Sequence, residues 1–348
     1  IEQLLEMSGK NASVMSDLLP MKMTYGAIQG SDRLRDAICT MYTKQTRDNI
    51  VVTHGAIGAN ALVHETLVEP GDHVISVRPT YQQHYSIPES YGANVDILQL
   101  RPENGFLPDL AELKSMVRPE TKLIVLNNPN NPTGALMEAD ALDAFVAIAR
   151  GCDAYVLCDE VYRGTNQIGD GFSPAMADVY EKGISVAGMS KTFSLAGLRL
   201  GWIAGPLDLL EAVSIHRDYN TISVGMLDDY FAAMALEAKD KILTRSQQIT
   251  RGNLAILDAW IAQEPSMSYV KPKAGTTALL KYDFDMPSRD FCIQLLEQTG
   301  VMFTPGSVMH MEGWLRVGYA NDPEILRTGL AKVSTFLAGL AAKSESVA

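Results

Sequence analysis

The chain has 348 residues, a formal net charge of -12 at pH 7 and a hydrophobic share of 47%. This length is sufficient for one large α/β core and a smaller lobe, and the apolar share is that of an ordinary globular protein. The acidic charge and the scarcity of Lys/Arg runs argue against nucleic acid or an anionic membrane as a partner, so we expect a small soluble ligand.

The sequence shows no pattern for metal binding, disulfide bonding or membrane insertion. Its four cysteines, Cys39, Cys152, Cys158 and Cys292, form no CxxC pair, so we predict reduced thiols and no metal site. No apolar run approaches the roughly 20 residues of a membrane helix, and the first residues lack the layout of a signal peptide. We therefore expect a cytoplasmic protein. Because the sequence begins with Ile1 rather than methionine, we also expect that an N-terminal piece precedes it.

From residue 49 to about residue 187, short apolar runs alternate with helical patterns, which is typical of a mostly parallel sheet with crossover helices. This pattern predicts an α/β large lobe with a mostly parallel sheet flanked by helices. The runs that we expect to form strands are 50–53, 73–77, 123–126, 155–158 and 184–187.

The pattern changes after this sheet. Two long helices, expected at 206–237 and 244–263, lead out of the large lobe. We therefore divide the chain into a large domain at 26–235 and a discontinuous small domain at 1–25 and 236–348. The small domain is predicted to be α+β, with strands at 278–282 and 314–319 and helices at 289–298 and 323–340.

Chemically distinctive residues follow the ends of the predicted strands. Ligands of open parallel sheets bind at the carboxyl ends of the strands, where these residues fall. The strand ends are therefore expected to form one site from Gly55, Tyr81, Asn131, Asp159 and Lys191.

The residue types at these strand ends suit pyridoxal 5'-phosphate (PLP). Lys191, in a Ser-Lys-Thr turn, offers the primary amine that the cofactor needs to form an imine. Asp159 is the candidate carboxylate that keeps the ring nitrogen protonated, although its neighbour Glu160 could compete for that role. Tyr162 and Asn131 are candidates to hydrogen-bond the ring hydroxyl oxygen, while Asn131 also lies in a sequence typical of turns.

The phosphate of such a cofactor needs backbone amides and a cation. The amides of Gly55, Ala56 and Ile57 lie where a strand gives way to an apolar helix, and a helix N-terminus attracts anions. Arg199 offers the planar fork that matches phosphate oxygens. Tyr81 is placed to lay its ring on the pyridine face, although an aromatic at a strand end is more often a core residue.

Together these residues resemble the class I/II aminotransferases of PLP fold type I. The resemblance runs from about Tyr25 to the Arg316 strand, and it implies a seven-stranded type of sheet in the large lobe. It implies that Tyr25 reaches the phosphate of a neighbouring subunit in a homodimer, and that Arg316, with Asn131, binds the α-carboxylate of the substrate. The family often has a phosphate-binding serine where this chain has Gly188, so Ser190 or backbone amides would have to substitute for it.

The leading hypothesis is amino-group transfer between an L-amino acid and a 2-oxo acid by a ping-pong mechanism, through an imine on Lys191. The same residues would serve a carbon-sulfur β-lyase, a decarboxylase or a cyclase, because these reactions differ in pocket contacts. A PLP-sensing DNA-binding regulator is a third hypothesis, which the acidic charge opposes. The substrate stays open: Gln82, Gln83 and His84 could contact a polar side chain, but solvated helix positions are the favoured interpretation.

Overall fold

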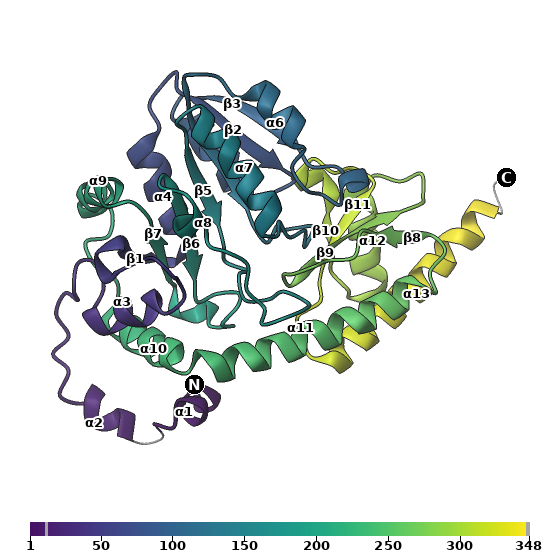
Figure 1. Ribbon diagram of the computed structural model, residues 1–348. Coiled ribbons are helices and arrows are strands. Elements are labelled where there is room, and N and C mark those ends of the chain that lie inside the picture. The colour runs from purple at the N-terminus through teal and green to yellow at the C-terminus, as the bar shows by residue number, and fades with distance from the viewer. Residues whose placement is uncertain (11–12, 346–348) are drawn as a thin grey trace.

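The computed structural model describes residues 1–10 and 13–345. A twisted seven-stranded sheet lies at the centre of the large lobe (Figure 1), with strand order β1-β7-β6-β5-β4-β2-β3. All strands run parallel except β7, which is antiparallel to both of its neighbours. The strands are β1 (Ile50–His54), β2 (His73–Arg78), β3 (Asn94–Gln99), β4 (Thr121–Asn127), β5 (Tyr155–Asp159), β6 (Gly183–Gly188) and β7 (Leu200–Ala204).

The predicted fold class is confirmed, and all five predicted strands of the large lobe are present. Two strands were not predicted, for different reasons. Strand β3 is an edge strand whose partly exposed residues make its sequence look like a loop. Strand β7 starts directly after Arg199 and contains Gly201, which lowers its apparent strand propensity.

Helices cover both faces of this sheet, since alternate strand residues point to opposite sides. On one face, Val51 belongs to a core cluster with residues of α4 (Gly55–Leu67) and α9 (Leu207–Asp218). On the other face, Val52 packs with α3 and α10, and the far half of the sheet packs with α7. The remaining large-lobe helices are α3 (Asp32–Cys39), α5 (Gln83–Ser90), α6 (Leu110–Met116), α7 (Ala139–Gly151), α8 (Met176–Val179) and α10 (Met226–Glu237).

The single helix predicted at 206–237 is wrong, because the structure has two helices there, α9 and α10. Residues 219–225 form the turn between them, in which Ile222 adopts a positive φ of 56° and Gly225 directly precedes α10. Apolar periodicity on both sides of this turn hid the interruption. The turn exposes Tyr219 and Ile222 to solvent.

A four-stranded antiparallel sheet, in the order β10-β11-β9-β8, forms the small lobe and confirms its predicted α+β composition. Helix α11 (Lys239–Ile261) runs from the large lobe to the small lobe, and α13 (Pro323–Glu345) lies beside it (Figure 1). The other elements are β8 (Met267–Tyr269), β9 (Thr277–Tyr282), α12 (Ser288–Thr299), β10 (Thr304–Pro305) and β11 (Trp314–Gly318).

The N-terminal helices α1 (Glu2–Ser8) and α2 (Val14–Leu18) pack against the large lobe, while our division of the chain into domains stays a prediction. Leu4 and Val14 are buried in the core cluster that also contains Trp202 of β7, so they pack against the large lobe. This packing favours placing the N-terminal segment with the large domain. The boundary near residue 235 stays a prediction.

Helix α13 also departs from expectation. Its segment Pro323–Ala342 has the length of a membrane span and a mean hydropathy of 1.2, although we expected no apolar run of that length. In the structure, one face of α13 packs into the small-lobe core, where Leu330, Val333 and Leu337 are buried. Packing against α11 and α12 therefore accounts for much of the apolar character of this helix.

Candidate active site

The sheet topology brings the predicted site residues to one edge. The parallel strands β1, β4, β5 and β6 all end at this edge, so the residues that follow them lie close together. Strand β7 runs in the opposite direction, and therefore its beginning, next to Arg199, meets the same edge. Arg316 of β11 faces these residues from the small lobe, since it lines the same cavity.

A cavity of about 410 Å³ lies at this junction. Ten of the predicted residues line it, which brings the catalytic, cofactor and substrate candidates together. They are Ala56, Ile57, Tyr81, Asn131, Asp159, Tyr162, Ser190, Lys191, Arg199 and Arg316, and the further lining residues are Asn60, Gln83, Asn127, Val161, Ala196, Thr276 and Thr277.

The carboxylate of Asp159 is buried and accepts two hydrogen bonds. Its Oδ2 accepts a hydrogen bond from Asn60 Nδ2 at 2.9 Å and lies 3.4 Å from His84 Nε2, while Oδ1 accepts from the Val161 amide at 3.1 Å. The competing Glu160 points away from this cavity and accepts hydrogen bonds from the Met176 amide and the Ser185 hydroxyl. Only Asp159 is therefore available to the cavity.

His84 is not a solvated helix position, and our favoured interpretation of it was wrong. The side chain is fully buried and lies against Asp159. Gln82 is exposed, as expected, whereas Gln83 lines the cavity and donates to the Ile57 carbonyl at 2.7 Å. The signal that was missed is the spacing, because His84 lies one helical turn after Tyr81 and so returns to the side of the site.

Asn131 and Arg316 are coupled across the two lobes. Arg316 Nη1 donates to Asn131 Oδ1 at 3.4 Å, and Nη2 donates to Thr304 Oγ1 at 3.2 Å. The Asn131 backbone amide donates to Asn127 Oδ1 at 2.6 Å, which fixes the turn that carries this residue. Both side chains are thereby directed into the cavity.

Tyr162 is buried in the cavity wall. Burial, followed by the nearby Asp159 carboxylate, raises the pKa of Tyr162 to about 12. Its hydroxyl therefore stays protonated near neutral pH and is able to donate a hydrogen bond. This is the property expected of a residue that contacts the ring oxygen of the cofactor.

The predicted phosphate cradle is formed by close backbone packing. Gly55 opens α4 with a positive φ of 68°, and a Cβ atom at this position would lie 2.9 Å from Arg199 Nη2. A Cβ atom on Gly201 would lie 2.4 Å from the Ala56 nitrogen. These two glycines therefore let the Arg199 side chain and the β7 backbone approach the first turn of α4, where amides attract an anion.

The structure explains why Gly188 stands in place of a serine. A Cβ atom there would lie 3.0 Å from the Leu200 carbonyl oxygen and 3.5 Å from the Ala56 nitrogen. Strand β6 thus lies very close to β7 and to the start of α4, which leaves little room for a side chain. Ser190 lines the cavity and stays a candidate substitute, together with the α4 amides.

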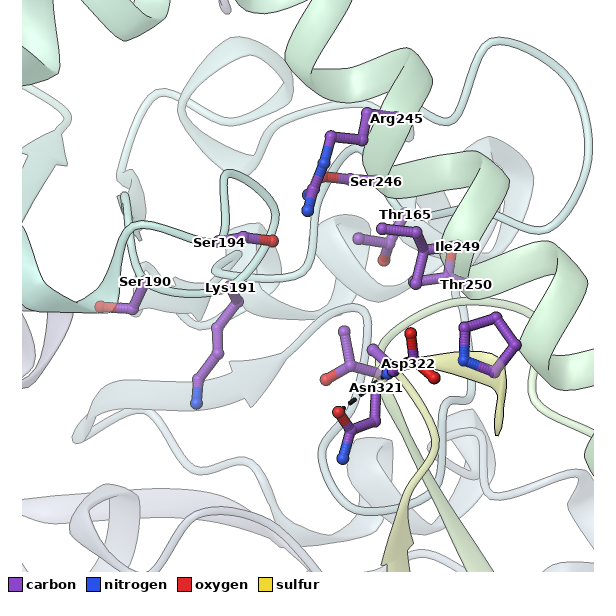
Figure 2. Close-up of a pocket in the computed structure, with 13 residues that line it drawn as sticks. Thr165, Ser190, Lys191, Ser194, Arg245, Ser246, Ile249, Thr250, Asn321 and Asp322 are labelled. Atoms are coloured by element: carbon purple, nitrogen blue, oxygen red, sulfur yellow. Dashed lines mark hydrogen bonds between the residues drawn. The ribbon is translucent and has the colours of Figure 1, made fainter. Parts of the chain in front are cut away.

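Lys191 lies between two cavities. Besides the cavity described above, a second one of about 530 Å³ lies on the side of α11 and Pro323, and the two share Ser190, Lys191 and Thr276. Figure 2 shows Lys191 extending from its turn, with Arg245 and Ser246 of α11 on the far side of the space. The Lys191 side chain is exposed in the single chain, so its amine is accessible from the cavities.

Two predicted cofactor residues, Gly55 and Tyr25, do not line this cavity, and of these Tyr25 is not part of the packing around Arg199. The Tyr25 side chain is 78% exposed and is therefore free to contact another subunit, and its role there stays a prediction. Asn60 is a site residue that we did not predict. A polar residue within the apolar run Ala59-Asn60-Ala61-Leu62 was a usable signal.

The donor set fits PLP on structural grounds. A lysine amine, a buried carboxylate with a free side toward the cavity, and a hydroxyl and an amide group line one cavity. The glycine cradle beside Arg199 provides for a phosphate at the other end.

Comparisons with known proteins agree with this chemistry. The model of the aminotransferase class I and II family matches residues 19–333. Capreomycidine synthase from Streptomyces vinaceus is 31% identical over 89% of this chain and 79% of its own length. Aspartate/prephenate aminotransferase from Thermus thermophilus is 26% identical over 91% of this chain and 84% of its own length.

Solved structures of PLP-dependent enzymes are also similar to this chain. A PLP-dependent aminotransferase from Streptococcus suis shares 44% identity with a TM-score of 0.94, covering 97% of this chain and 90% of the other. The PLP-dependent cyclase OrfR shares 27% identity with a TM-score of 0.90, covering 97% and 90%. The family match, the sheet topology and the lysine-carboxylate-arginine site lead to one conclusion: the chain is a PLP-dependent enzyme of the class I and II aminotransferases.

Proposed function

We propose that the protein transfers an amino group between an L-amino acid and a 2-oxo acid by a ping-pong mechanism. The observation that carries this proposal is the single cavity shared by the Lys191 amine, the Asp159 carboxylate and the Arg316 guanidinium. Amino-group transfer needs an amine that moves a proton, a group that stabilises the cofactor ring and a fork that orients the substrate.

Each residue has a distinct role in this proposal. PLP, when bound, withdraws electrons from the substrate and so makes its α-carbon acidic. Arg316 binds the α-carboxylate as a planar fork, and Asn131 holds that fork through its Oδ1 atom. The Lys191 amine would take the α-proton at Nζ and deliver it to the carbon on the other side of the substrate nitrogen. Tyr162 donates its hydroxyl proton to the ring oxygen, and Asp159 faces the ring nitrogen.

The remaining cofactor residues hold the group in place. The amides of Ala56 and Ile57, at the start of α4, and the Arg199 fork bind the phosphate. Ser190 substitutes for the serine that Gly188 replaces, and Tyr81 packs on the ring face. Tyr81 is 43% exposed in the single chain, which leaves its ring available for such stacking.

We also propose that the active unit is a homodimer in which Tyr25 contacts the phosphate in the partner subunit. Large apolar side chains near Tyr25 are exposed, among them Met23 and Ile28, and the turn after α9 adds Tyr219 and Ile222. Burying such groups favours association. Sedimentation of the holoenzyme tests the dimer, and a fully active monomer would contradict it.

The proposed location is the cytoplasm, which is consistent with the four cysteines being free thiols. Cell fractionation followed by detection of the protein would test this location. Recovery in the membrane or extracellular fraction would contradict it.

Cyclisation is the second candidate, and a specific observation favours it. Two of the similar proteins, capreomycidine synthase and the cyclase OrfR, are not named as aminotransferases, although they align over most of the chain. A carbon-sulfur β-lyase or a decarboxylase would use the same cofactor residues. These reactions differ from transamination in what happens after the α-proton has left.

A visible absorbance spectrum of the holoenzyme separates these functions. Single amino acids are added without an oxo acid, and then 2-oxoglutarate or pyruvate is supplied. Transamination predicts a stoichiometric loss of the lysine-bound absorbance, which the oxo acid restores. A lyase would instead release pyruvate and ammonia continuously, a decarboxylase would release carbon dioxide, and a cyclase would give a cyclic product without any oxo-acid acceptor.

A further inference from the structure

We propose that Asn60 is a positioning residue for Asp159, which keeps that carboxylate directed at the ring nitrogen of the cofactor. The inference rests on the proposed PLP site and assigns a role to a residue of α4 that touches the carboxylate but not the reacting atoms. Its direct observation is the 2.9 Å hydrogen bond from Asn60 Nδ2 to Asp159 Oδ2.

The surroundings of this hydrogen bond are dry. Asn60 is 1% exposed and Asp159 is 5% exposed, so water competes little for either group. A hydrogen bond to a carboxylate in such a place is stronger than at a surface, and leaving the carboxylate without its donor is costly. The contact therefore has more effect than an exposed amide-carboxylate pair would have.

The orientation of the Asp159 carboxylate depends on which donors each of its two oxygens faces. Oδ2 of Asp159 faces both Asn60 and His84, whereas Oδ1 accepts only the Val161 amide. Each carboxylate oxygen accepts about two hydrogen bonds. Each oxygen therefore keeps capacity for a further donor from the cavity, and the hydrogen bonds from Asn60 and the Val161 amide fix the rotation of the carboxylate.

Helix α4 connects this contact to the phosphate cradle. Asn60 lies five residues after Gly55, which corresponds to about 7.5 Å along a helix axis. The helix thus provides backbone amides at its first turn and a side-chain donor further along, with both groups lining one cavity or its glycine cradle. One rigid element sets the distance between the two ends of the cofactor site.

His64 lies one further turn along α4 and completes the buried environment. It is fully buried, and burial, followed by the charge of nearby His84, lowers the pKa of His64 to about 3. The imidazole is therefore neutral at physiological pH. Among the residues that the structure describes, no lysine or arginine pairs with the Asp159 carboxylate. The side-chain hydrogen bond that it accepts comes from the uncharged amide of Asn60.

The test is nitrogen-15 NMR of the holoenzyme loaded with ring-labelled PLP, combined with the dissociation constant of PLP. For Asn60→Ala we expect the ring-nitrogen signal to shift toward the unprotonated form and PLP to bind about tenfold more weakly, as the loss of a hydrogen bond to a charged group implies. Asn60→Ser, which keeps a short donor, should give an intermediate shift.

Asn253→Ala is the matched control. Asn253 is also 1% exposed, and its amide donates to the carbonyls of Tyr319 and Asn321, away from Asp159. Its loss should lower thermal stability without moving the ring-nitrogen signal. A purely structural role for Asn60 would make Asn60→Ala behave like this control.

The outcomes separate the inference from the proposed function. If wild-type protein binds no PLP, the proposed function fails. If it binds PLP but the nitrogen signal of Asn60→Ala equals that of wild type and affinity changes less than twofold, the positioning role is overturned. If Asn60→Ala does not fold, the same measurements are made on Asn60→Ser and Asn60→Gln. An unchanged ring-nitrogen signal and an unchanged PLP affinity in both variants would then overturn the positioning role.

Discussion

On the large-lobe side of the cavity, Asp159 accepts two hydrogen bonds, lies 3.4 Å from the His84 ring and has almost no exposure. On the small-lobe side, Arg316 has two contacts, at 3.4 and 3.2 Å, one of which reaches across to the large lobe. The first arrangement is complete without a substrate, whereas the second has donors to spare for a carboxylate. The cofactor half is therefore preorganised, and the substrate half is open to an incoming ligand.

The largest effect should come from Lys191, where the two halves meet. Lys191→Ala removes the amine that moves the proton, so we expect the turnover number to fall by about 10⁴-fold or more. Steady-state kinetics with an amino acid donor measure it. Lys182→Ala is the control, since Lys182 pairs with Asp153 at the opposite edge of the sheet. Equal activity of Lys191→Ala and wild type would exclude the proposed mechanism.

The substrate half is tested by Arg316→Lys. A lysine keeps the charge but loses the planar fork, so kcat/KM for the amino acid should fall by about 100-fold, with PLP affinity unchanged. Kinetics and cofactor titration of the same preparation check both parts. Arg289→Lys, on the exposed surface of α12, should behave as wild type. A large loss of PLP affinity in Arg316→Lys would contradict the division into two halves.

Glu160, which is buried in the large lobe, should make the stability of the protein depend on pH. Burial raises the pKa of Glu160 from 4.5 to about 7, although Arg163 opposes this. A raised carboxyl pKa means that its stabilisation is present at low pH and is lost as pH rises from about 4.5 through about 7. Glu160→Gln should remove this loss, so the stability difference from wild type should change by about 2 kcal/mol between pH 5 and pH 8.

Urea unfolding of both proteins at the two pH values measures that change. The variant should gain stability relative to wild type as pH rises. A difference between the proteins that is the same at pH 5 and pH 8 would show that Glu160 titrates as an ordinary carboxyl group.

The smallest loss of stability is expected from a substitution at Tyr42, which lies in the large lobe but away from the cavity. Trp202 Nε1 donates to the Tyr42 hydroxyl at 2.8 Å in a buried site. Tyr42→Phe leaves this indole N–H without an acceptor and should cost about 1 to 2 kcal/mol of stability. Denaturant unfolding measures the cost, and PLP affinity should not change. A change in affinity would mean that the preorganised region extends further than the cavity.

Much of the site could be predicted because its residues follow buried strands, whose ends are recognisable in the sequence. Asn131, Asp159 and Lys191 were predicted in this way, and all three line the cavity. The strand β7 was missed because Gly201 serves packing against α4, which no local pattern reveals. The turn at 219–225 was missed because apolar residues continue through it.

Contacts between residues that are far apart in the sequence were harder to predict. Asn60 and His84 contact Asp159 from helices α4 and α5, 99 and 75 positions away in the chain, and the sequence does not show which residues so far apart meet in space. His84 was interpreted as solvated because polar residues in helices usually face water. Only the packing of α5 against the sheet shows that it does not.

The reversed direction of β7 has a consequence for the connection between Lys191 and Arg199. Because β6 ends and β7 begins at the same edge, a short segment that includes the 3-10 turn Ala196–Leu198 links Lys191 to Arg199, the proposed phosphate ligand. The length of that segment limits how far apart the two attachment points of the cofactor lie. A single inserted residue there would change the span between them, while the sheet itself stayed intact.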